Sequence, residues 1–390
     1  MEKELAYAII SPYTIRKSRT GAVLSRLLGR ISSQLIATQM IALTKDMAEL
    51  YANSVMPGKD PEDEKLRAAI RSYIRNTMAP SPNGRRHRSL MMVFCGENAQ
   101  DELSSVAGSL TISADTGETI RNTYGDLVYD ENGRIRFFEP AILVSDRISN
   151  NREEIKMWLD FIRDQEPLLE NICEYKNPEQ VEQTLVLLKP DTWRQRSARP
   201  GTIVDMFSRT ELRIIGCKLL EMSVAQALDF YGPVKNALRR KLSPKIGLDA
   251  KQILEDQFKF RLPEGAEKSL AEHIGVPYAD DQFEKIIEFM SGRRPSDCPP
   301  ELRNSPGTAR TLGLVYEGEG AVQKIRDVLG PTDPMKAPDG TVRREFGSDV
   351  MVNTAHASDS PENAQREISI IEMRKSNFVE KVNLALEECT

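Results

Sequence analysis

The sequence predicts an α+β protein made of two similar βαββαβ units in tandem, each an antiparallel sheet covered by helices. A motif that occurs twice is the first observation. Ser145-Asp146, Asn150 and Glu154-Ile155 reappear 213 residues later as Ser358-Asp359, Asn363 and Glu367-Ile368. The second observation is that short apolar runs alternate with segments whose apolar residues have helical spacing. This pattern is typical of sheets covered by helices. The length of 390 residues is the third, since it suffices for two ordinary domains.

In the second repeat the elements follow a definite order. We expect strands at 184–188, 213–221, 311–317 and 348–353, and helices at 201–209, 223–231, 281–290, 319–329 and after Ser360. Gly201 and Ser223 stand where helices should begin, and Gly330-Pro331 is a typical helix stop. Without the extra helices the order is β-α-β-β-α-β, which is the ferredoxin-like arrangement.

The first half repeats this order of features. Ala6–Pro12 parallels Leu185–Pro190 near the start of each repeat. Gly108 precedes Arg121 by 13 residues, and Gly330 precedes Arg343 by the same interval. We therefore expect one fold unit to occur twice along the chain.

The domain boundaries follow from these features. Residues 1–150 form the first predicted repeat, 151–180 a helix and connector, and 181–390 the second repeat, with an insertion around 236–278. Apolar residues from Ile155 to Ile172 have nearly helical spacing. Residues 58–65 and 293–308 are rich in Pro, Gly, Asp and Arg, so we expect surface loops or insertions there.

Composition narrows the classes of function. Lys and Arg number 53 against 58 Asp and Glu, so a global positive field for nucleic acid is absent. No apolar run reaches the length of a membrane-spanning helix, and Met1–Glu4 does not form the positively charged start of a signal peptide. We therefore expect a cytoplasmic protein. Five cysteines form no CxxC pair, which favours reduced, packed thiols. GxGxxG, Walker and HExxH motifs are missing.

Three strings in the second repeat resemble the signature of the nucleoside diphosphate kinases. They are Lys189-Pro190-Asp191, Gly340-Thr341-Val342-Arg343 and Asn353-Thr354-Ala355-His356-Ala357-Ser358-Asp359-Ser360. The family pattern is KPD, G-T-I-R and N-x-x-H-G/A-S-D. The resemblance spans 183–231 and about 281–370, and residues 4–160 look like a weaker relative. It implies transfer of the γ-phosphate of a nucleoside triphosphate to a nucleoside diphosphate, by a ping-pong mechanism with Mg²⁺ and a phosphohistidine.

The resemblance also assigns roles to individual residues. His356 matches the nucleophile, and a neutral imidazole is a competent nucleophile near pH 7. Glu367 and Ser358 match the groups that orient its ring. The residues matched to nucleotide contacts are Lys189 (sugar hydroxyl and phosphate oxygens), Tyr231 (γ-phosphate), Arg326, Thr332 and Arg343 (phosphate clamp), Asn353 (sugar hydroxyls) and Phe283 (base). No carboxylate cluster predicts a protein-only metal site, so the Mg²⁺ is implied by the resemblance and by the need to bridge phosphate oxygens.

The first repeat departs from the pattern. Leu143 corresponds to His356, and the residues that correspond to Lys189, Arg326, Thr332 and Asn353 are Ser11, Ser104, Leu110 and Pro140. Because leucine cannot carry phosphate, we expect an inert repeat that forms an internal pseudo-dimer with the second. Two other functions stay open: a catalytically weak nucleotide-binding scaffold or regulatory protein, and a protein that donates phosphohistidine phosphate to another protein. A homo-oligomer is also possible.

Overall fold

The computed structural model describes residues 3–111, 117–145 and 151–389, and it divides into two compact units. The large unit contains residues 1–219 and 312–390, and the small unit contains residues 220–311. Asp146 and Asn150 of the repeated motif lie outside the described residues. No helix among the described residues is long and apolar enough to cross a membrane.

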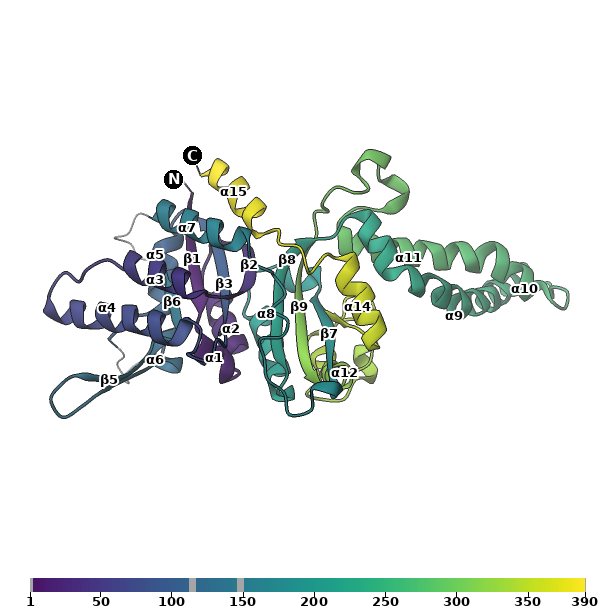
Figure 1. Ribbon diagram of the computed structural model, residues 1–390. Helices are drawn as coiled ribbons and strands as arrows, with labels where there is room; N and C mark the ends of the chain where they lie inside the picture. Colours follow the sequence, from purple (N-terminus) through teal and green to yellow (C-terminus); the bar gives the residue numbers. More distant parts are fainter. Residues whose placement is uncertain (1–2, 112–116, 146–150, 390) are drawn as a thin grey trace. The chain divides into compact units, whose positions relative to one another are not determined.

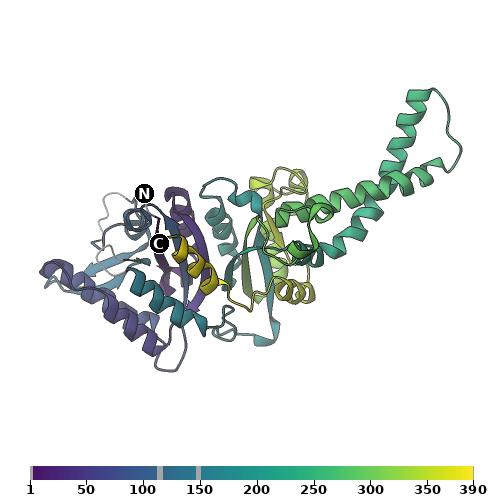
Figure 2. The ribbon, with the colours of Figure 1, turned by 90° about the horizontal axis from the view of Figure 1, so that it is seen from above.

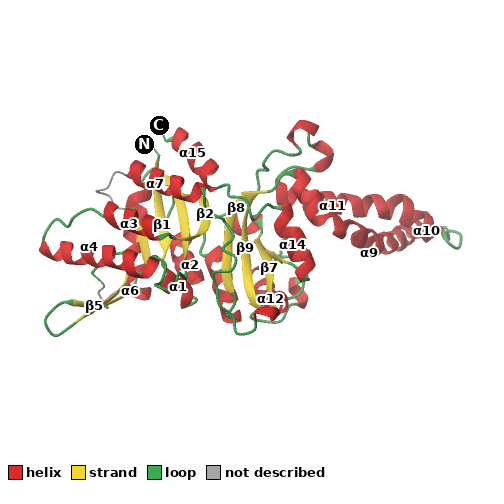
Figure 3. Cartoon of the chain, in the orientation of Figure 1, coloured by secondary structure: helices red, strands yellow, loops and turns green. Residues whose placement is uncertain are grey.

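Two four-stranded sheets with the same strand order form the framework (Figures 1 and 3). The first has the order β2-β3-β1-β6, and the second β10-β7-β9-β8, so in each sheet the strand that comes first in the chain lies between the third and the fourth. Pairs β1–β3, β1–β6, β2–β3, β7–β9 and β7–β10 are antiparallel, which confirms the predicted α+β class. The bounds are β1 Glu4–Ile10, β2 Gln34–Ala42, β3 Arg88–Gly96, β6 Ile142–Val144, β7 Val181–Leu188, β8 Arg213–Glu221, β9 Arg310–Glu319 and β10 Ala355–Ala357.

Helices cover both faces of the first sheet because its strands are apolar on both sides. Ala8 and Ile10 share one buried cluster with Leu27 of α2. Tyr7 shares the other with Trp158 of α7. The helices of the large unit are α1 Pro12–Arg16, α2 Thr20–Arg30, α3 Lys45–Ser54, α4 Pro61–Tyr73, α5 Ala99–Ala107, α6 Ile120–Tyr124, α7 Asn151–Arg163, α8 Arg199–Phe207, α12 Ala321–Leu329, α13 Val342–Phe346, α14 Pro361–Ile370 and α15 Phe378–Glu388.

Helices α2 and α8 approach each other closely and symmetrically within the large unit. A Cβ at Gly21 of α2 would overlap the backbone nitrogen of Asp205 in α8. A Cβ at Gly201 of α8 would overlap the backbone nitrogen of Ser25 in α2. Each helix thus needs a glycine opposite the same backbone position of the other, which is the reciprocal pattern of a two-fold contact.

The small unit is a pair of long helices with short connections (Figure 2). Helix α9 spans Val224–Phe258, α10 Ala266–Leu270 and α11 Val276–Ser291. The Arg239 guanidinium of α9 donates to Asp280 of α11 at 2.7 Å, which ties the start of α11 to α9. The insertion predicted around 236–278 is therefore mostly helical. Residues 293–308 form loops with short 3₁₀ turns, which confirms that prediction.

Two elements predicted for the second repeat are wrong, for identifiable reasons. The helix expected at 223–231 continues to Phe258 through Pro233 and Pro244, although proline usually ends a helix. The strand expected at 348–353 is a loop, because Asp349 Oδ1 accepts the N–H groups of Met351 and Val352 at 2.7 Å and closes a turn. The strand of this region is β10, which begins at Ala355, two residues after the end of the predicted strand.

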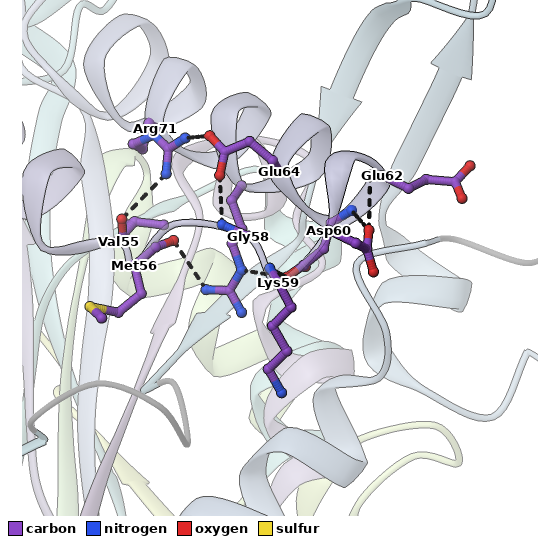
Figure 4. Close-up of polar contacts among 10 residues, drawn as sticks. Val55, Met56, Gly58, Lys59, Asp60, Glu62, Glu64 and Arg71 are labelled. Carbon is purple, nitrogen blue, oxygen red and sulfur yellow. Dashed lines mark hydrogen bonds and ion pairs between the residues drawn. The ribbon is translucent and has the colours of Figure 1, made fainter.

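The loop expected at 58–65 is helical from Pro61 onward, since α4 begins there (Figure 4). Asp60 caps this helix by accepting the N–H groups of Glu62 and Asp63 at 2.9 Å. The preceding loop is fastened to α4, because Glu64 accepts the N–H of Gly58 at 2.6 Å and also pairs with Arg71.

Candidate active site

His356 lies at the middle of β10, opposite Leu187 of β7. Its Nε2 is 3.0 Å from Glu367 Oε2, and the Ser358 hydroxyl donates to the same oxygen at 2.6 Å. The imidazole is 22% exposed and the Glu367 side chain 6%. The structure therefore brings the predicted nucleophile and both predicted orienting residues together, with the ring still reachable from solvent.

The local sequence explains this arrangement. Ser360 caps α14 by accepting the N–H of Asn363, and Pro361 occupies the first helical position, so the helix starts directly after the strand. Glu367 then faces β10 from the second turn. An ionised carboxylate only accepts hydrogen bonds, so Glu367 favours the tautomer in which Nε2 carries the proton. In that tautomer the lone pair of the His356 ring is on Nδ1.

Lys189 follows β7 directly and is almost fully buried. Its Nζ donates to Asn353 Oδ1 at 2.7 Å and to the Met351 carbonyl at 3.2 Å. Burial, and to a lesser extent the positive charge of Arg343, lower the pKa of Lys189 from 10.5 to about 8, although the nearby carboxylates of Asp191 and Asp349 oppose this shift. The site therefore holds an ammonium group with little solvation to lose when an anion binds.

Asn353 joins three segments around Lys189. Its Nδ2 donates to the Thr332 carbonyl at 3.1 Å and to the Val350 carbonyl at 2.7 Å. Both amide hydrogens are therefore used within the protein, and the side chain is 1% exposed. Asn353 positions Lys189 in this structure, and its predicted contact with sugar hydroxyls stays a prediction.

The residues of the predicted phosphate clamp are placed differently from one another. Arg343 donates to the Gly330 carbonyl at 2.9 Å and to the Ala355 carbonyl, next to His356, at 3.0 Å. Arg326 on α12 and Thr332 after it are exposed. Arg326 makes no side-chain hydrogen bond or ion pair with the residues that the structure describes.

Tyr231 and Phe283 belong to the small unit. The Tyr231 ring packs against Phe230 with centroids 5.0 Å apart. Phe283 is only 4% exposed, and the Lys235 ammonium lies 5.6 Å from its ring centroid. A ring covered to this degree offers no open face to a base in this conformation. The roles of both residues stay predictions.

Sequence analysis assigned no role to Asp191, which is part of the KPD string. It is 7% exposed, and neither carboxylate oxygen has a hydrogen-bond partner among the described residues. Burial raises the pKa of Asp191, while the charge of Lys189 two residues earlier opposes the rise. In the sequence, only its place in the KPD string pointed to Asp191, because residue types do not show whether a carboxylate is buried.

Thr354, just before β10, has the left-handed φ of 76°. It is the centre of a three-residue turn in which the Ala355 N–H donates to the Asn353 carbonyl at 2.8 Å. The same turn occurs before β6, where Ala141 has φ of 59° and the Ile142 N–H donates to the Pro140 carbonyl at 2.6 Å. Since the turn occurs in both sheets, its strain belongs to the architecture and not to chemistry at His356.

The corresponding place in the first sheet lacks the reactive groups. Leu143 lies opposite Ile9, as His356 lies opposite Leu187. A buried carboxylate, Glu139, accepts the Ser11 hydroxyl at 2.6 Å, and burial raises its pKa. Ser11 is the residue that sequence analysis matched to Lys189. The first sheet therefore has a carboxyl group, Glu139, beside the position where the second sheet has the cation Lys189. This exchange disfavours phosphate binding in the first sheet.

A small cavity remains beside Leu143. Its volume is about 140 Å³, and it is lined by residues that include Tyr51, Arg121 and Glu154. Glu154 accepts the Tyr7 hydroxyl at 2.9 Å, in place of the histidine that Glu367 contacts in the second sheet. The volume is below the range of typical small-molecule sites, so the cavity is too small for a nucleotide.

Comparison with known proteins gives a consistent result. The family model described as nucleoside diphosphate kinase matches residues 299–375. The chain is 30% identical over 189 residues to the nucleoside diphosphate kinase of Paracoccus denitrificans, covering 48% of this chain and 91% of that protein. For the enzyme of Bdellovibrio bacteriovorus the identity is 28%, with 49% and 92% covered. The solved structure of an NDP kinase from Pyrobaculum aerophilum is 27% identical, covers 49% of this chain and 94% of its own, and has a TM-score of 0.34.

Proposed function

The chain belongs to the nucleoside diphosphate kinase family, and from this premise we propose that residues 181–390 carry the γ-phosphate of a nucleoside triphosphate to a nucleoside diphosphate through phosphorylated His356. The contact of His356 Nε2 with Glu367 at 3.0 Å is the observation that carries the proposal. It supports a ring whose Nδ1 is the nucleophile and whose developing positive charge is stabilised by a buried carboxylate.

The two half-reactions are the same step in opposite directions. Nδ1 of His356 attacks the γ-phosphorus, the N–P bond forms, and the bond from that phosphorus to the β-phosphate oxygen breaks. The nucleoside diphosphate leaves with the electron pair of that bond. A terminal oxygen of a second nucleoside diphosphate then attacks the phosphorus, and the N–P bond breaks. Glu367 holds the Nε2 proton throughout, so the ring returns to its starting tautomer.

Charge on the transferred oxygens needs cations placed in advance. Lys189 and Arg343 are held beside the segment that carries His356, by the hydrogen bonds to Asn353 and Ala355. No group of three or more His, Cys, Asp or Glu side chains within the described ranges could hold a metal ion. This fits Mg²⁺ bound mainly by the nucleotide phosphates and water, where it would neutralise phosphate charge.

The proposal includes the organisation of the whole chain. We propose that residues 1–150 are a second kinase-like unit that is inert, and that the two units form an internal pseudo-dimer. The common strand order, the paired turns at Ala141 and Thr354, and the reciprocal glycines of α2 and α8 support this. The cytoplasmic location stays a prediction from the sequence.

The test uses the full chain with γ-labelled ATP and Mg²⁺, followed by re-isolation and a chase with GDP. We expect an acid-labile label on the protein that moves to GDP, and no label on the His356→Ala variant. Leu143→Met, a matched change in the first sheet, should leave labelling intact. Full labelling of His356→Ala would contradict the mechanism. A label that GDP cannot remove would favour the protein phosphohistidine donor, and no label would favour the scaffold.

A further inference from the structure

A pocket of about 610 Å³ lies between α4 and the hairpin of β4 (Asp126–Tyr129) and β5 (Ile135–Glu139). Figure 1 shows this hairpin projecting beside α4. The two elements are in contact, because the rings of Tyr73 and Phe138 meet edge to face with centroids 6.3 Å apart. No residue assigned to the His356 site lines this pocket, so its function needs a separate account.

The charged side chains that line the pocket are all cations. Lys65 of α4 and Arg134 and Arg136 of the hairpin are exposed, and they make no side-chain hydrogen bond or ion pair with any residue in the described ranges. None of the described residues that line the pocket carries a carboxylate. Asp130 in the hairpin turn is used locally, because it accepts the N–H groups of Asn132 and Arg134 at 2.9 Å. Like charges gathered without counterions favour an anionic ligand.

An aromatic side chain stands beside these cations. Phe137 lines the pocket and is 44% exposed, although a ring of this size is usually covered. The Phe137 ring packs edge to face against Tyr13, with centroids 6.2 Å apart. Two more cations, Arg16 and Lys17, lie 6.0 and 5.4 Å from the Tyr13 ring centroid. The positive charge therefore continues past Phe137, and this ring is packed against Tyr13 while almost half of the residue stays exposed.

We propose that this pocket binds a nucleoside phosphate as a second, non-catalytic site. Guanidinium and ammonium groups suit phosphate oxygens. An exposed aromatic ring suits a base, because base–aromatic stacking tolerates any base. The volume lies within the range of small-molecule sites, which fits one nucleotide better than an extended strand. The inference does not depend on phosphorylation of His356.

The experiment titrates the full chain with ADP by calorimetry, in the absence of a phosphoryl donor so that no turnover occurs. Wild type should bind ADP in two steps, one at the His356 site and one in this pocket, and the Arg134→Glu/Arg136→Glu variant should lose the pocket step alone. Arg152→Glu, an exposed charge reversal on α7 outside the pocket, should keep that step. Phe137→Ala should weaken it about tenfold, because the stacking of the base on the ring is lost. Equal thermal unfolding midpoints would show that the variants are folded.

Further probes separate the ligand sources. Inorganic pyrophosphate should bind the pocket at least tenfold more weakly than ADP, and a ten-residue oligothymidylate should not displace ADP at equal nucleotide concentration. An ADP isotherm that is the same in wild type and in the double variant would overturn the proposal. Pyrophosphate binding equal to ADP would also overturn it, since the base would then contribute nothing. Tighter binding of the oligonucleotide would identify the pocket as a single-strand site instead.

Discussion

Arg121 and Arg343 make the same two contacts in the two sheets. Arg343 donates to the carbonyls of Gly330 and Ala355. Arg121 donates to those of Gly108 and Ile142. The first sheet keeps these contacts although it has no histidine. We therefore infer that the main role of each arginine is structural: it holds the last strand of its sheet, β6 or β10, against the end of a helix, α5 or α12. Any contact of Arg343 with phosphate is additional to this bracing.

This double function predicts different outcomes for the two arginines. Arg121→Met and Arg343→Met should each lower the free energy of unfolding by about 1–3 kcal/mol, since buried carbonyls lose charged donors. Only Arg343→Met should also slow phosphorylation of the protein by ATP. Urea unfolding and single-turnover labelling measure the two effects. Unchanged stability of Arg343→Met would mean that its bonds to the backbone contribute nothing.

Lys189 predicts a pH dependence. Its pKa is lowered to about 8 in the folded protein, from 10.5, chiefly by burial. Between these values the unfolded chain binds the proton and the folded chain does not, so this group makes stability rise with pH across the window. In the folded protein the charge that Lys189 offers to phosphate is lost as pH rises through about 8.

The rate of phosphorylation by ATP should therefore fall as pH rises through about 8. Lys189→Arg keeps its charge at these pH values, so any activity it retains should not fall in this range. Initial labelling rates from pH 6.5 to roughly 9.5 measure both profiles. The same decline in wild type and in Lys189→Arg would assign the titration to another group.

At the scale of elements, the contact of α2 with α8 depends on glycine. Gly21 and Gly201 stand where a Cβ would overlap backbone atoms of the facing helix. Backbone at such a contact cannot move aside as a side chain does, so a methyl group there acts as overpacking. Gly29 lies on the same helix as Gly21, but a Cβ there would make only ordinary van der Waals contacts, all with Ala198 and none closer than 3.4 Å.

Gly21→Ala should therefore lower the free energy of unfolding by about 1–3 kcal/mol. Gly29→Ala should leave it unchanged or raise it by roughly 0.5–1 kcal/mol, because glycine is costly within helices. Denaturant unfolding of both variants gives the comparison. Equal effects from the two substitutions would show that α2 and α8 do not depend on close backbone approach.

The sequence predicted those parts of the site that lie close together in the chain. His356, Ser358 and Glu367 fall within twelve residues, so a short strand and the following helix bring them together. The contact of Lys189 with Asn353 was not predictable, because it joins segments 164 residues apart. The apolar residues of 348–353 favour a strand, but the side chain of Asp349 closes a turn there, and residue types alone do not reveal this hydrogen bonding.

Some elements escaped prediction because tertiary packing overrides local preference. Prolines 233 and 244 would end an isolated helix, yet α9 continues to Phe258 alongside α10 and α11. Thr354 takes a left-handed φ that residue types do not indicate. The fold class was predictable, because the repeated motif and apolar runs carry it.

At the scale of the molecule, one chain contains two sheets of the same order and, in our account, one reactive site. The first sheet keeps the arginine contacts, the turn and the acid on the following helix. It has Leu143 in place of the nucleophile, and Ser11, bonded to Glu139, in place of the cation Lys189. In the proposed pseudo-dimer, the contact of α2 with α8 joins the two repeats within the large unit.

The most direct measurement of this account is the number of phosphoryl groups that one chain accepts. The protein is incubated with excess ATP and Mg²⁺ without acceptor, and its intact mass is recorded at neutral pH to preserve phosphohistidine. We predict one phosphoryl group per chain in wild type and none in His356→Ala. Two groups per chain, or one retained in His356→Ala, would contradict a single reactive histidine beside an inert repeat.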